Sequence, residues 1–284
     1  MNGLVSRPRH GLSLCAGGGG LDLGLMLAEP GFHTRAFVEW EDWPRTVLVA
    51  AQRAGYFVPA PIWDDLRSFD ARPFRGAFDI VLAGYPCQPF SAAGKRGGAD
   101  DPRQLWPEVA RVIRECSPEW VFLENVSGHV TLGLESVLRE LWRMCYTPAA
   151  GLFSAAEVGA PHQRLRIFIL AHTDEPASGT ERYNPAGNSD FTRKAEALAL
   201  GIINWSTPKA TDLESPGAAA AEPAIRRLVD GLAHRSRALR LLGNGVHPLA
   251  AAHAWRTLAA AHGLGPLDLA PSRWAGRPGP DESF

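Results

Sequence analysis

Short apolar strands alternate with helical stretches through the first 171 residues, and this alternation constrains the fold more than any other feature. The expected strands are Leu12–Cys15, Ala36–Glu39, Phe78–Leu82, Trp120–Leu123, Ala149–Phe153 and Arg166–Leu170. The expected helices are Leu21–Ala28, Pro44–Ala54, Leu105–Glu115 and Leu134–Met144. Strands separated by helices are typical of a parallel sheet. The sequence therefore predicts an α/β fold with a mostly parallel sheet and helices on both faces.

The pattern breaks between His172 and about Arg240, and this break divides the chain. The stretch is polar and holds several Gly and Pro residues, so it is either an inserted small domain or a set of long loops. A helix pattern returns at Pro248–Ala261, before a Pro- and Gly-rich tail, Gly263–Phe284. We expect three parts, namely a first domain (1–171), a short segment (172–240) and a C-terminal part (241–284) whose helix returns to the first domain.

Composition limits the compartment and the partners. A chain of 284 residues with 45% hydrophobic residues is long enough for one large domain with an insertion, or for two unequal domains. The formal net charge of -1 neither requires nor excludes a nucleic-acid partner, which would need a local basic patch. The four cysteines lack metal-ligand or disulfide spacing, and no apolar run suits a signal peptide or a bilayer span. We expect a soluble cytoplasmic protein without a metal or a membrane contact.

Cys87 is the strongest candidate for a nucleophile. It follows the apolar run Phe78–Leu82, so a buried strand would deliver it to the edge where open α/β sheets expose catalytic groups. Pro86 fixes the backbone before it, and a loop of glycine and small residues follows. A lone cysteine is more often a core residue, which is the better interpretation of the other three. At this position the sequence instead favours a reactive thiolate.

A carboxyl group and two arginines are expected at the same sheet edge. Glu124 ends the apolar strand Trp120–Leu123, which predicts a partly buried carboxyl that holds a proton near neutral pH. The alternative is an ordinary carboxylate at a strand end. Arg164 and Arg166 are spaced by two at a strand start, so both would point to one face and bind an anion or a polarised carbonyl. The alternative is one surface arginine and one salt bridge.

The glycine-rich segment Leu12–Gly20 joins the first strand to the first helix. Glycines there permit a ligand to approach backbone N–H groups at the helix N-terminus. Glu39 ends the second strand, from where a carboxylate accepts hydrogen bonds from ribose hydroxyls. Asp65 follows a possible third strand and could contact an adenine amino group. The alternative is a glycine turn with solvated acids, but a nucleoside without pyrophosphate fits the spacing better than a dinucleotide.

Seven motifs in one order resemble the C5-cytosine-specific DNA methyltransferase family of bacterial or phage type. They are Leu14–Gly20, Glu39-Trp40, Asp64–Leu66, Gly84–Ser91, Glu124–Val126, Gln163–Arg166 and Gly243–Val246. One such motif would be weak evidence, but seven in the family's order are specific. The resemblance covers nearly all of residues 11–171 and 241–261. It implies a Rossmann-like, S-adenosylmethionine-dependent catalytic domain, with residues 172–240 as a short target-recognition segment.

The resemblance also implies the chemistry, which is methyl transfer from S-adenosylmethionine to C5 of a flipped-out cytosine, leaving S-adenosylhomocysteine. The Cys87 thiolate would attack C6, while Glu124 would hold N3 and the exocyclic amine. Arg166 would contact the O2 carbonyl and Arg164 would support the pocket. The implied cofactor-binding residues are Cys15, Ala16, Gly17, Gly18, Gly20, Glu39, Trp40, Asp65, Leu66, Pro86, Leu105, Asn244 and Val246. The implied DNA-binding residues are Gln88, Ser91, Lys95, Arg96, Arg226 and Arg227.

Two departures from the family pattern concern the first motif. The family often has an acidic or similar polar residue at the position of Ser13 and an aromatic residue at that of Cys15, so stacking on the adenine is expected to differ here.

The loop Gln88–Asp101 would close over the flipped nucleotide, as its counterpart in the family does. Arginines between Arg226 and Arg240 would position phosphates, although a solvated helix face is the alternative.

Three functions remain in competition. The leading one is a monomeric DNA (cytosine-5)-methyltransferase acting on double-stranded DNA at the nucleoid, either alone or with a cognate restriction endonuclease. A tRNA cytosine-5 methyltransferase would share the chemistry, but the Cys-Phe-Thr element associated with that branch is absent from the sequence. A catalytically silent nucleic-acid-binding protein is the third, and the presence of Cys87, Glu124 and both arginines argues against it.

Overall fold

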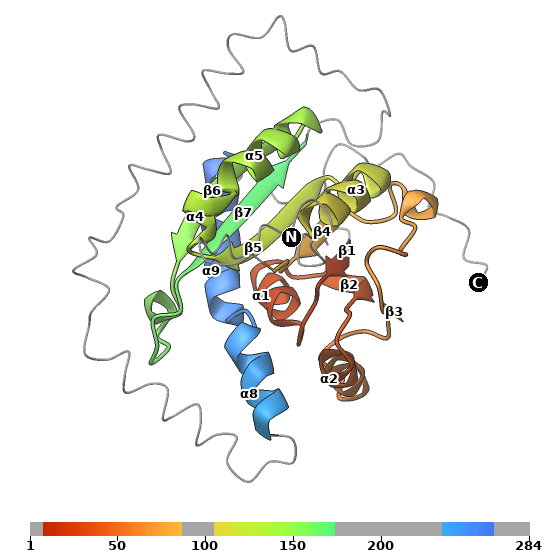
Figure 1. Cartoon of the computed structure of the whole chain (residues 1–284), viewed down its shortest axis with the longest axis vertical. Helices are drawn as coiled ribbons and strands as arrows, with labels where there is room; N and C mark the ends of the chain where they lie inside the picture. Colours follow the sequence, from red (N-terminus) through yellow and green to blue (C-terminus); the bar gives the residue numbers. More distant parts are fainter. Residues whose placement is uncertain (1–7, 87–104, 174–234, 264–284) are drawn as a thin grey trace, which may run out of the picture.

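The computed structural model describes residues 8–86, 105–173 and 235–263, and within them seven strands form one sheet (Figure 1). The strands are β1 (Arg9–Leu14), β2 (Phe32–Val38), β3 (Ile62–Trp63), β4 (Ile80–Ala83), β5 (Trp120–Val126), β6 (Thr147–Phe153) and β7 (Arg166–His172). The helices are α1 (Gly20–Ala28), α2 (Asp42–Arg53), α3 (Trp106–Cys116), α4 (His129–Leu132), α5 (Leu134–Arg143), α8 (Arg235–Asn244) and α9 (Pro248–Ala261), with 3-10 turns η1 (Arg72–Phe74) and η2 (Ala156–Val158). The strand order is β3-β2-β1-β4-β5-β7-β6.

The sheet is mostly parallel, which confirms the predicted fold class. β1 pairs in parallel with β2 and β4, and β4 pairs in parallel with β5. β7 is the exception to the parallel pairing, because it runs antiparallel to both β5 and β6. The connection from β6 to β7 holds only the turn η2, and a parallel pair requires a longer crossover, usually through a helix.

Both faces of the sheet are buried, and β5 illustrates this because its alternate residues belong to two different apolar clusters. Val121 and Leu123 pack in one apolar cluster with residues of α3 and α5, while Trp120 and Phe122 pack in another with residues of α1 and α9. Successive side chains of a strand point to opposite faces, so a strand covered on both sides must be apolar throughout. This explains why the strands appear in the sequence as continuous apolar runs.

Helix α9 returns to the first part of the chain and packs on α1, and both helices cover the same face of the sheet (Figure 1). Close approach is possible because Gly24 has no side chain at the crossing. A Cβ atom on Gly24 would lie 2.5 Å from Ala251 Cβ and 2.6 Å from the Pro248 carbonyl oxygen. The fold is thereby closed by a helix that lies more than two hundred residues further along the chain than α1.

Gly24→Ala is expected to lower the free energy of unfolding by about 1–3 kcal/mol, the usual cost of overpacking a core. The alanine would push against the backbone and Cβ atoms of α9, which cannot rotate away, although the helix preference of alanine opposes this by about 1 kcal/mol. Denaturant unfolding measures the change. Gly128→Ala is the control, because a Cβ there meets nothing within 4 Å. An unfolding midpoint of Gly24→Ala at or above that of the wild type would contradict the tight packing.

One helix begins inside the stretch where the sequence pattern breaks. α8 (Arg235–Asn244) starts before the expected boundary at residue 240 and crosses it. Its sequence is rich in arginine and polar overall, so the apolar pattern did not mark it, and only the alternative of a solvated helix face for these arginines anticipated it. The expected segment 172–240 and tail 263–284 otherwise lie almost entirely outside the described residues.

Candidate functional site

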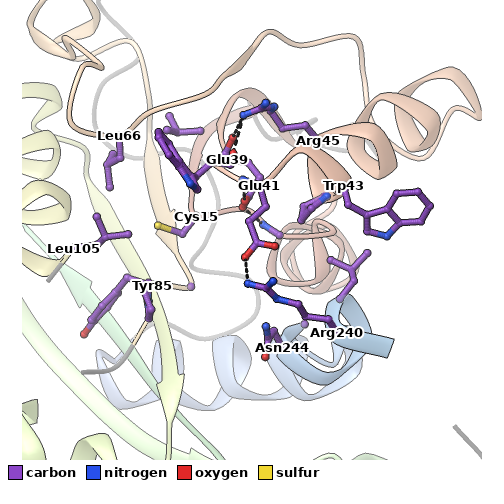
Figure 2. Close-up of a pocket in the computed structure, with 18 of the residues that line it drawn as sticks. Cys15, Glu39, Glu41, Trp43, Arg45, Leu66, Tyr85, Leu105, Arg240 and Asn244 are labelled. Atoms are coloured by element: carbon purple, nitrogen blue, oxygen red, sulfur yellow. Dashed lines mark hydrogen bonds and ion pairs between the residues drawn. The ribbon is translucent and has the colours of Figure 1, made fainter. Parts of the chain in front are cut away.

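A cavity of about 1220 Å³ opens where β1, β2, β4 and β5 end (Figure 2). The strand order reverses between β1 and β4, and ligands of open α/β sheets bind at such a point. The expected cofactor-binding residues that line the cavity are Cys15, Gly17, Glu39, Trp40, Asp65, Leu66, Pro86, Leu105 and Asn244. Ala16, Gly18, Gly20 and Val246 are not among the lining residues. Gly18 and Gly20 instead face Leu241 and the Val246 carbonyl of the α8–α9 segment.

The glycine loop between β1 and α1 forms one wall of the cavity. Gly19 has a φ of 78°, and a Cβ there would lie 2.6 Å from the Phe57 ring, so only glycine fits. Gly17 has a φ of 55° and open space where its Cβ would be. α1 begins after this loop without a side-chain cap. The loop therefore offers backbone surface to a ligand rather than side chains.

The Glu39 carboxylate is held from two sides. Its Oε2 accepts a hydrogen bond from the Gly17 N–H at 2.7 Å, and its Oε1 accepts one from the Glu41 N–H at 2.8 Å. Burial raises the pKa of Glu39 above its ordinary value, although the two N–H donors oppose this. Each carboxylate oxygen has a second lone pair, so Glu39 can accept two further hydrogen bonds from a ligand in the cavity.

Arg45 is a cavity residue that the sequence reasoning missed, and Arg240, which was expected to position phosphates, lines the cavity as well. Arg45 Nη1 donates to the backbone carbonyls of Glu39 and Trp40 at 3.2 and 2.8 Å, which orders the turn after β2. Arg240 of α8 reaches Glu41 at 2.7 Å (Figure 2). The acidic residues Glu41 and Asp42 lie close to Arg45 in the sequence, and this spacing could have indicated a structured turn. No such local signal exists for Arg240, because its partner Glu41 lies 199 positions away.

A buried carboxylate lies beside Ser13, at one of the two departures from the family pattern. Asp22 of α1 is fully buried and accepts hydrogen bonds from Ser13 Oγ at 2.9 Å and Thr34 Oγ1 at 2.7 Å. Burial raises the pKa of Asp22 to about 6, despite both hydroxyl donors. The other departure, Cys15, lines the cavity with a φ of 51°, and burial raises the pKa of its thiol to about 12.

Glu124 and Arg166 form a pair in the lining of the cavity. Arg166 Nε lies 3.0 Å from Glu124 Oε1, and Glu124 is 7% exposed. Burial raises the pKa of Glu124 to about 7, and the nearby charges of Arg166 and Arg164 only partly offset that effect. A carboxyl group with this pKa is present in both protonation states at neutral pH, so it can either donate or accept a hydrogen bond there.

Asn125 connects the end of β5 to the segment that leads to Cys87. Its Nδ2 donates to the Tyr85 carbonyl at 3.0 Å. The Tyr85 hydroxyl and His129 Nε2 are 3.1 Å apart, and both side chains are buried. A Cβ on Gly84 would meet Glu124 Oε2 at 3.6 Å, so the strand ends of β4 and β5 converge at the cavity.

Arg164 does not share a face with Arg166, and that expectation is wrong. β7 begins only at Arg166, and Arg164 lies before it with a φ of 39°, so the alternation of a strand does not apply. Arg164 Nη1 donates to the Gly243 carbonyl at 2.9 Å, and Nη2 donates to the Gly245 carbonyl. Burial lowers the pKa of Arg164 to about 10. The Arg164 side chain thus connects the residues directly before β7 to the segment between α8 and α9.

Several predicted site residues lie outside the described residues. They are Cys87, Gln88, Ser91, Lys95, Arg96, Arg226 and Arg227. Of the catalytic candidates, Glu124 and Arg166 line the cavity, as do Tyr85 and Pro86 directly before Cys87. Across the described ranges, no cluster of three or more His, Cys, Asp or Glu side chains has the geometry of a metal site. None of the helices in those ranges has the length and apolar character needed to cross a membrane.

Comparisons with known proteins give a consistent answer. A family model described as C-5 cytosine-specific DNA methylase matches residues 10–223. The type II methyltransferase M.NgoMIV of Neisseria gonorrhoeae is 32% identical over 205 residues, which are 68% of this chain and 64% of that protein. M.HpaII of Haemophilus parainfluenzae is 42% identical over 101 residues, 33% of this chain and 28% of that protein.

The fold is also similar to that of a solved structure. The S. pombe Dnmt2 methyltransferase aligns with a TM-score of 0.58 and 16% identity, covering 89% of this chain and 99% of that one. At this identity the likeness concerns the fold. This chain matches 64% and 34% of the lengths of the first two curated relatives, M.NgoMIV and M.BanI. Because the family model matches well over half of the chain, this protein belongs to the C-5 cytosine-specific DNA methylase family.

Proposed function

We propose that this chain is a DNA (cytosine-5)-methyltransferase that uses S-adenosylmethionine to methylate cytosine in double-stranded DNA. The observation that carries the proposal is a single cavity lined by Gly17 and Glu39 and also by Glu124 and Arg166. A carboxylate suited to a nucleoside and a carboxyl–guanidinium pair suited to a pyrimidine ring therefore open on the same space. The family model and the names of the type II relatives support this function and a role beside a cognate endonuclease.

The residues of the cavity fit S-adenosylmethionine by their chemistry. Glu39 has free lone pairs for ribose hydroxyls, and the open space at Gly17 leaves room for a ligand against the backbone. Trp40 is 67% exposed beside Glu39 and would offer an aromatic face to an adenine, and Asp65 and Leu66 also line the cavity. When bound, the cofactor supplies an electrophilic methyl group on its sulfonium.

The pair of Glu124 and Arg166 suits a flipped cytosine. Protonated Glu124 would donate a hydrogen bond to N3, and its other oxygen would accept one from the exocyclic amine. Arg166 would donate to the O2 carbonyl, so both groups would draw electron density from the ring. The Cys87 thiolate would then add to C6, and C5 would gain the nucleophilic character needed to accept a methyl group. Loss of the C5 proton and expulsion of the thiolate would restore the aromatic ring.

The remaining parts of the chain receive roles by the same proposal. The target carbon is inaccessible in a stacked duplex, so the base must leave the helix. Residues 88–101, including Lys95 and Arg96, would contact the flipped strand, and residues 172–240 would read the target sequence. Residues 1–171 and the helix after residue 240 would form the catalytic domain, which acts as a monomer. Arg164 would support the pocket by holding Gly243 and Gly245.

Glu39→Ala is expected to weaken cofactor binding by about 1–3 kcal/mol, the cost of losing hydrogen bonds to a charged group. Calorimetric titration with S-adenosylhomocysteine measures this without turnover. Glu135→Ala is the control, because that carboxylate is 83% exposed, pairs with Arg139 and lies outside the cavity lining. Thermal unfolding of the same samples checks that the Gly17 loop, which Glu39 also binds, is intact. Unchanged affinity in Glu39→Ala would place the ribose elsewhere.

Transfer of a labelled methyl group tests the function directly. Purified protein is incubated with methyl-labelled S-adenosylmethionine and either duplex DNA or total tRNA. We expect label in DNA and none in tRNA, and bisulfite sequencing of the DNA should show protected cytosines in one short sequence context. Label in tRNA alone would overturn the choice of DNA. No label in either nucleic acid, from protein that binds the cofactor, would favour a silent binding protein.

A further inference from the structure

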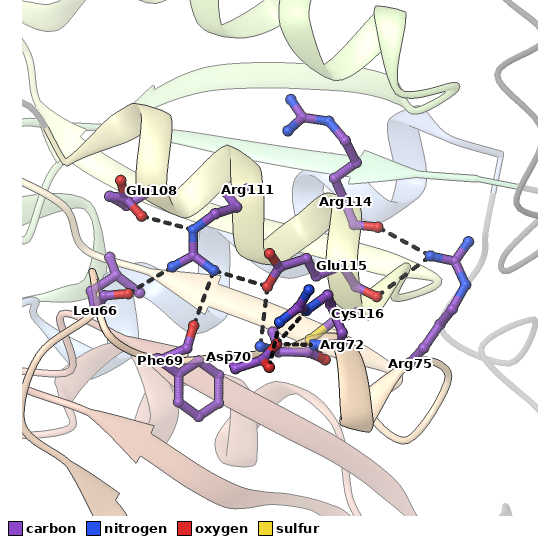
Figure 3. Close-up of polar contacts among 11 residues, drawn as sticks. Leu66, Phe69, Asp70, Arg72, Arg75, Glu108, Arg111, Arg114, Glu115 and Cys116 are labelled. Carbon is purple, nitrogen blue, oxygen red and sulfur yellow. Dashed lines mark hydrogen bonds and ion pairs between the residues drawn. The ribbon is translucent and has the colours of Figure 1, made fainter.

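Arg111 of α3 is the centre of a polar cluster outside the cavity (Figure 3). Its Nε donates to Glu108 Oε2 at 2.8 Å, and its Nη1 donates to Glu115 Oε2 at 2.8 Å. The same guanidinium donates to two backbone carbonyls, that of Phe69 at 3.0 Å from Nη1 and that of Leu66 at 2.8 Å from Nη2. All three nitrogens of one side chain are thus engaged, and that side chain is 27% exposed.

The two carbonyls belong to the segment that forms one wall of the cavity. Asp64, Asp65, Leu66 and Arg67 all line the cavity, and Leu66 is 5% exposed. This segment follows β3, a strand of only two residues, and it has no regular structure before η1. The segment has turn hydrogen bonds of its own, which Asp65 accepts from Arg67 and Ser68, but β3 offers little anchorage, so bonds from elsewhere in the fold help to fix its position. Arg111 supplies two of them from α3.

The pattern of partners explains why an arginine stands at this position. Glu108 and Glu115 lie one turn before and one turn after it on the same helix, and their carboxylates orient the guanidinium. A planar fork with five donors can then bind two separate carbonyls at the same time. The compact ammonium of lysine would keep the charge beside both glutamates but would not reach both carbonyls in this geometry.

We propose that Arg111 is a positioning residue of the cofactor cavity. It holds the Asp65–Leu66 wall in the geometry that binds S-adenosylmethionine, although it does not itself line the cavity. The inference rests on the proposed function, because it assigns that wall to the cofactor. Affinity for the cofactor should therefore depend on Arg111, whereas the affinity for DNA and the chemistry at Glu124 should not.

The experiment compares Arg111→Lys with Arg114→Lys in the full chain. Arg114 is the matched control, since it lies on the same helix and its side chain contacts Glu140 of α5 rather than the cavity wall. We expect Arg111→Lys to raise the Kd for S-adenosylhomocysteine and the KM for S-adenosylmethionine about tenfold, a typical effect for a residue coupled to a site without touching it. The KM for DNA and the kcat at saturating cofactor should stay within about twofold of the wild type.

Hydrogen–deuterium exchange supplies a readout that does not depend on activity. Amides of residues 64–69 should exchange faster in Arg111→Lys and at the wild-type rate in Arg114→Lys. Glu108→Gln removes one orienting carboxylate but leaves both bonds from Arg111 to the carbonyls, so it should give a smaller rise in the Kd. This variant replaces Arg111→Lys in the experiment if Arg111→Lys does not fold. A lower melting temperature of Arg111→Lys with unchanged Kd and KM would overturn the inference about Arg111 and leave the proposed function standing. Failure of the wild type to bind S-adenosylhomocysteine would overturn the proposed function and the inference together.

Discussion

Cys87→Ser is expected to abolish methyl transfer, by more than about a thousandfold, while leaving cofactor binding unchanged. A serine hydroxyl is almost fully protonated at neutral pH and is a far weaker nucleophile than a thiolate. Cys87 lies outside the described residues, but Tyr85 and Pro86 directly before it line the cavity with Glu124. Labelled methyl transfer measures the loss, and calorimetric titration with S-adenosylhomocysteine measures the retained binding.

Trapping of a covalent adduct identifies the nucleophile independently of turnover. DNA carrying 5-fluorocytosine at the target position cannot lose a C5 proton, so the wild-type protein should remain bonded to it. Cys145→Ser is the control, because Cys145 is exposed and lies outside the cavity lining. That variant should form the adduct like the wild type, and Cys87→Ser should form none. An adduct that maps to any other cysteine would contradict the assignment.

Glu124→Gln is expected to lower kcat about 100-fold to 10,000-fold, the range for losing a general acid–base group. Glutamine keeps the shape and can still hydrogen bond, but it cannot share a proton with the ring. The pKa of Glu124 is about 7, so in the wild type the protonated form is lost as the pH rises through 7. Its contribution to kcat/KM, which reports the groups of the free enzyme, should decline over that range, and this decline should be missing in the variant. Stopped-flow rates between pH 6 and 9 provide the comparison, and an identical profile in both proteins would contradict the role of Glu124.

The same pKa has a consequence for stability. Burial raises the pKa of Glu124 from its ordinary value of 4.5 to about 7, so the folded protein binds this proton more tightly than the unfolded chain does. The stabilisation is fully present below pH 4.5 and is lost as the pH rises through 7. Each pKa unit corresponds to about 1.4 kcal/mol, so the stability of Glu124→Gln relative to the wild type should rise by about 3 kcal/mol across this window. Urea unfolding at several pH values measures it, and a constant difference would contradict the raised pKa.

The cavity could be anticipated from short motifs because of a general property of parallel sheets. Glu39 and Glu124 each come at the end of an apolar strand, and the carboxyl ends of neighbouring parallel strands meet at one edge. The same argument placed Gly17 and Pro86 there, and all four residues line one cavity. The roles of these residues in binding and catalysis stay predictions, as does the position of Cys87.

The sequence by itself determined the fold class, most of the strands and helices, and the family, because strand and helix periods and ordered motifs depend on residues close together in the chain. Tertiary structure alone decided the direction of β7, the different bonding partners of Arg164 and Arg166, and the bonds of Arg111 to the cavity wall. Arg111 meets Leu66 across 45 positions, and Arg164 meets Gly243 across 79. Such contacts follow from how whole elements pack, and no local pattern of residues encodes them.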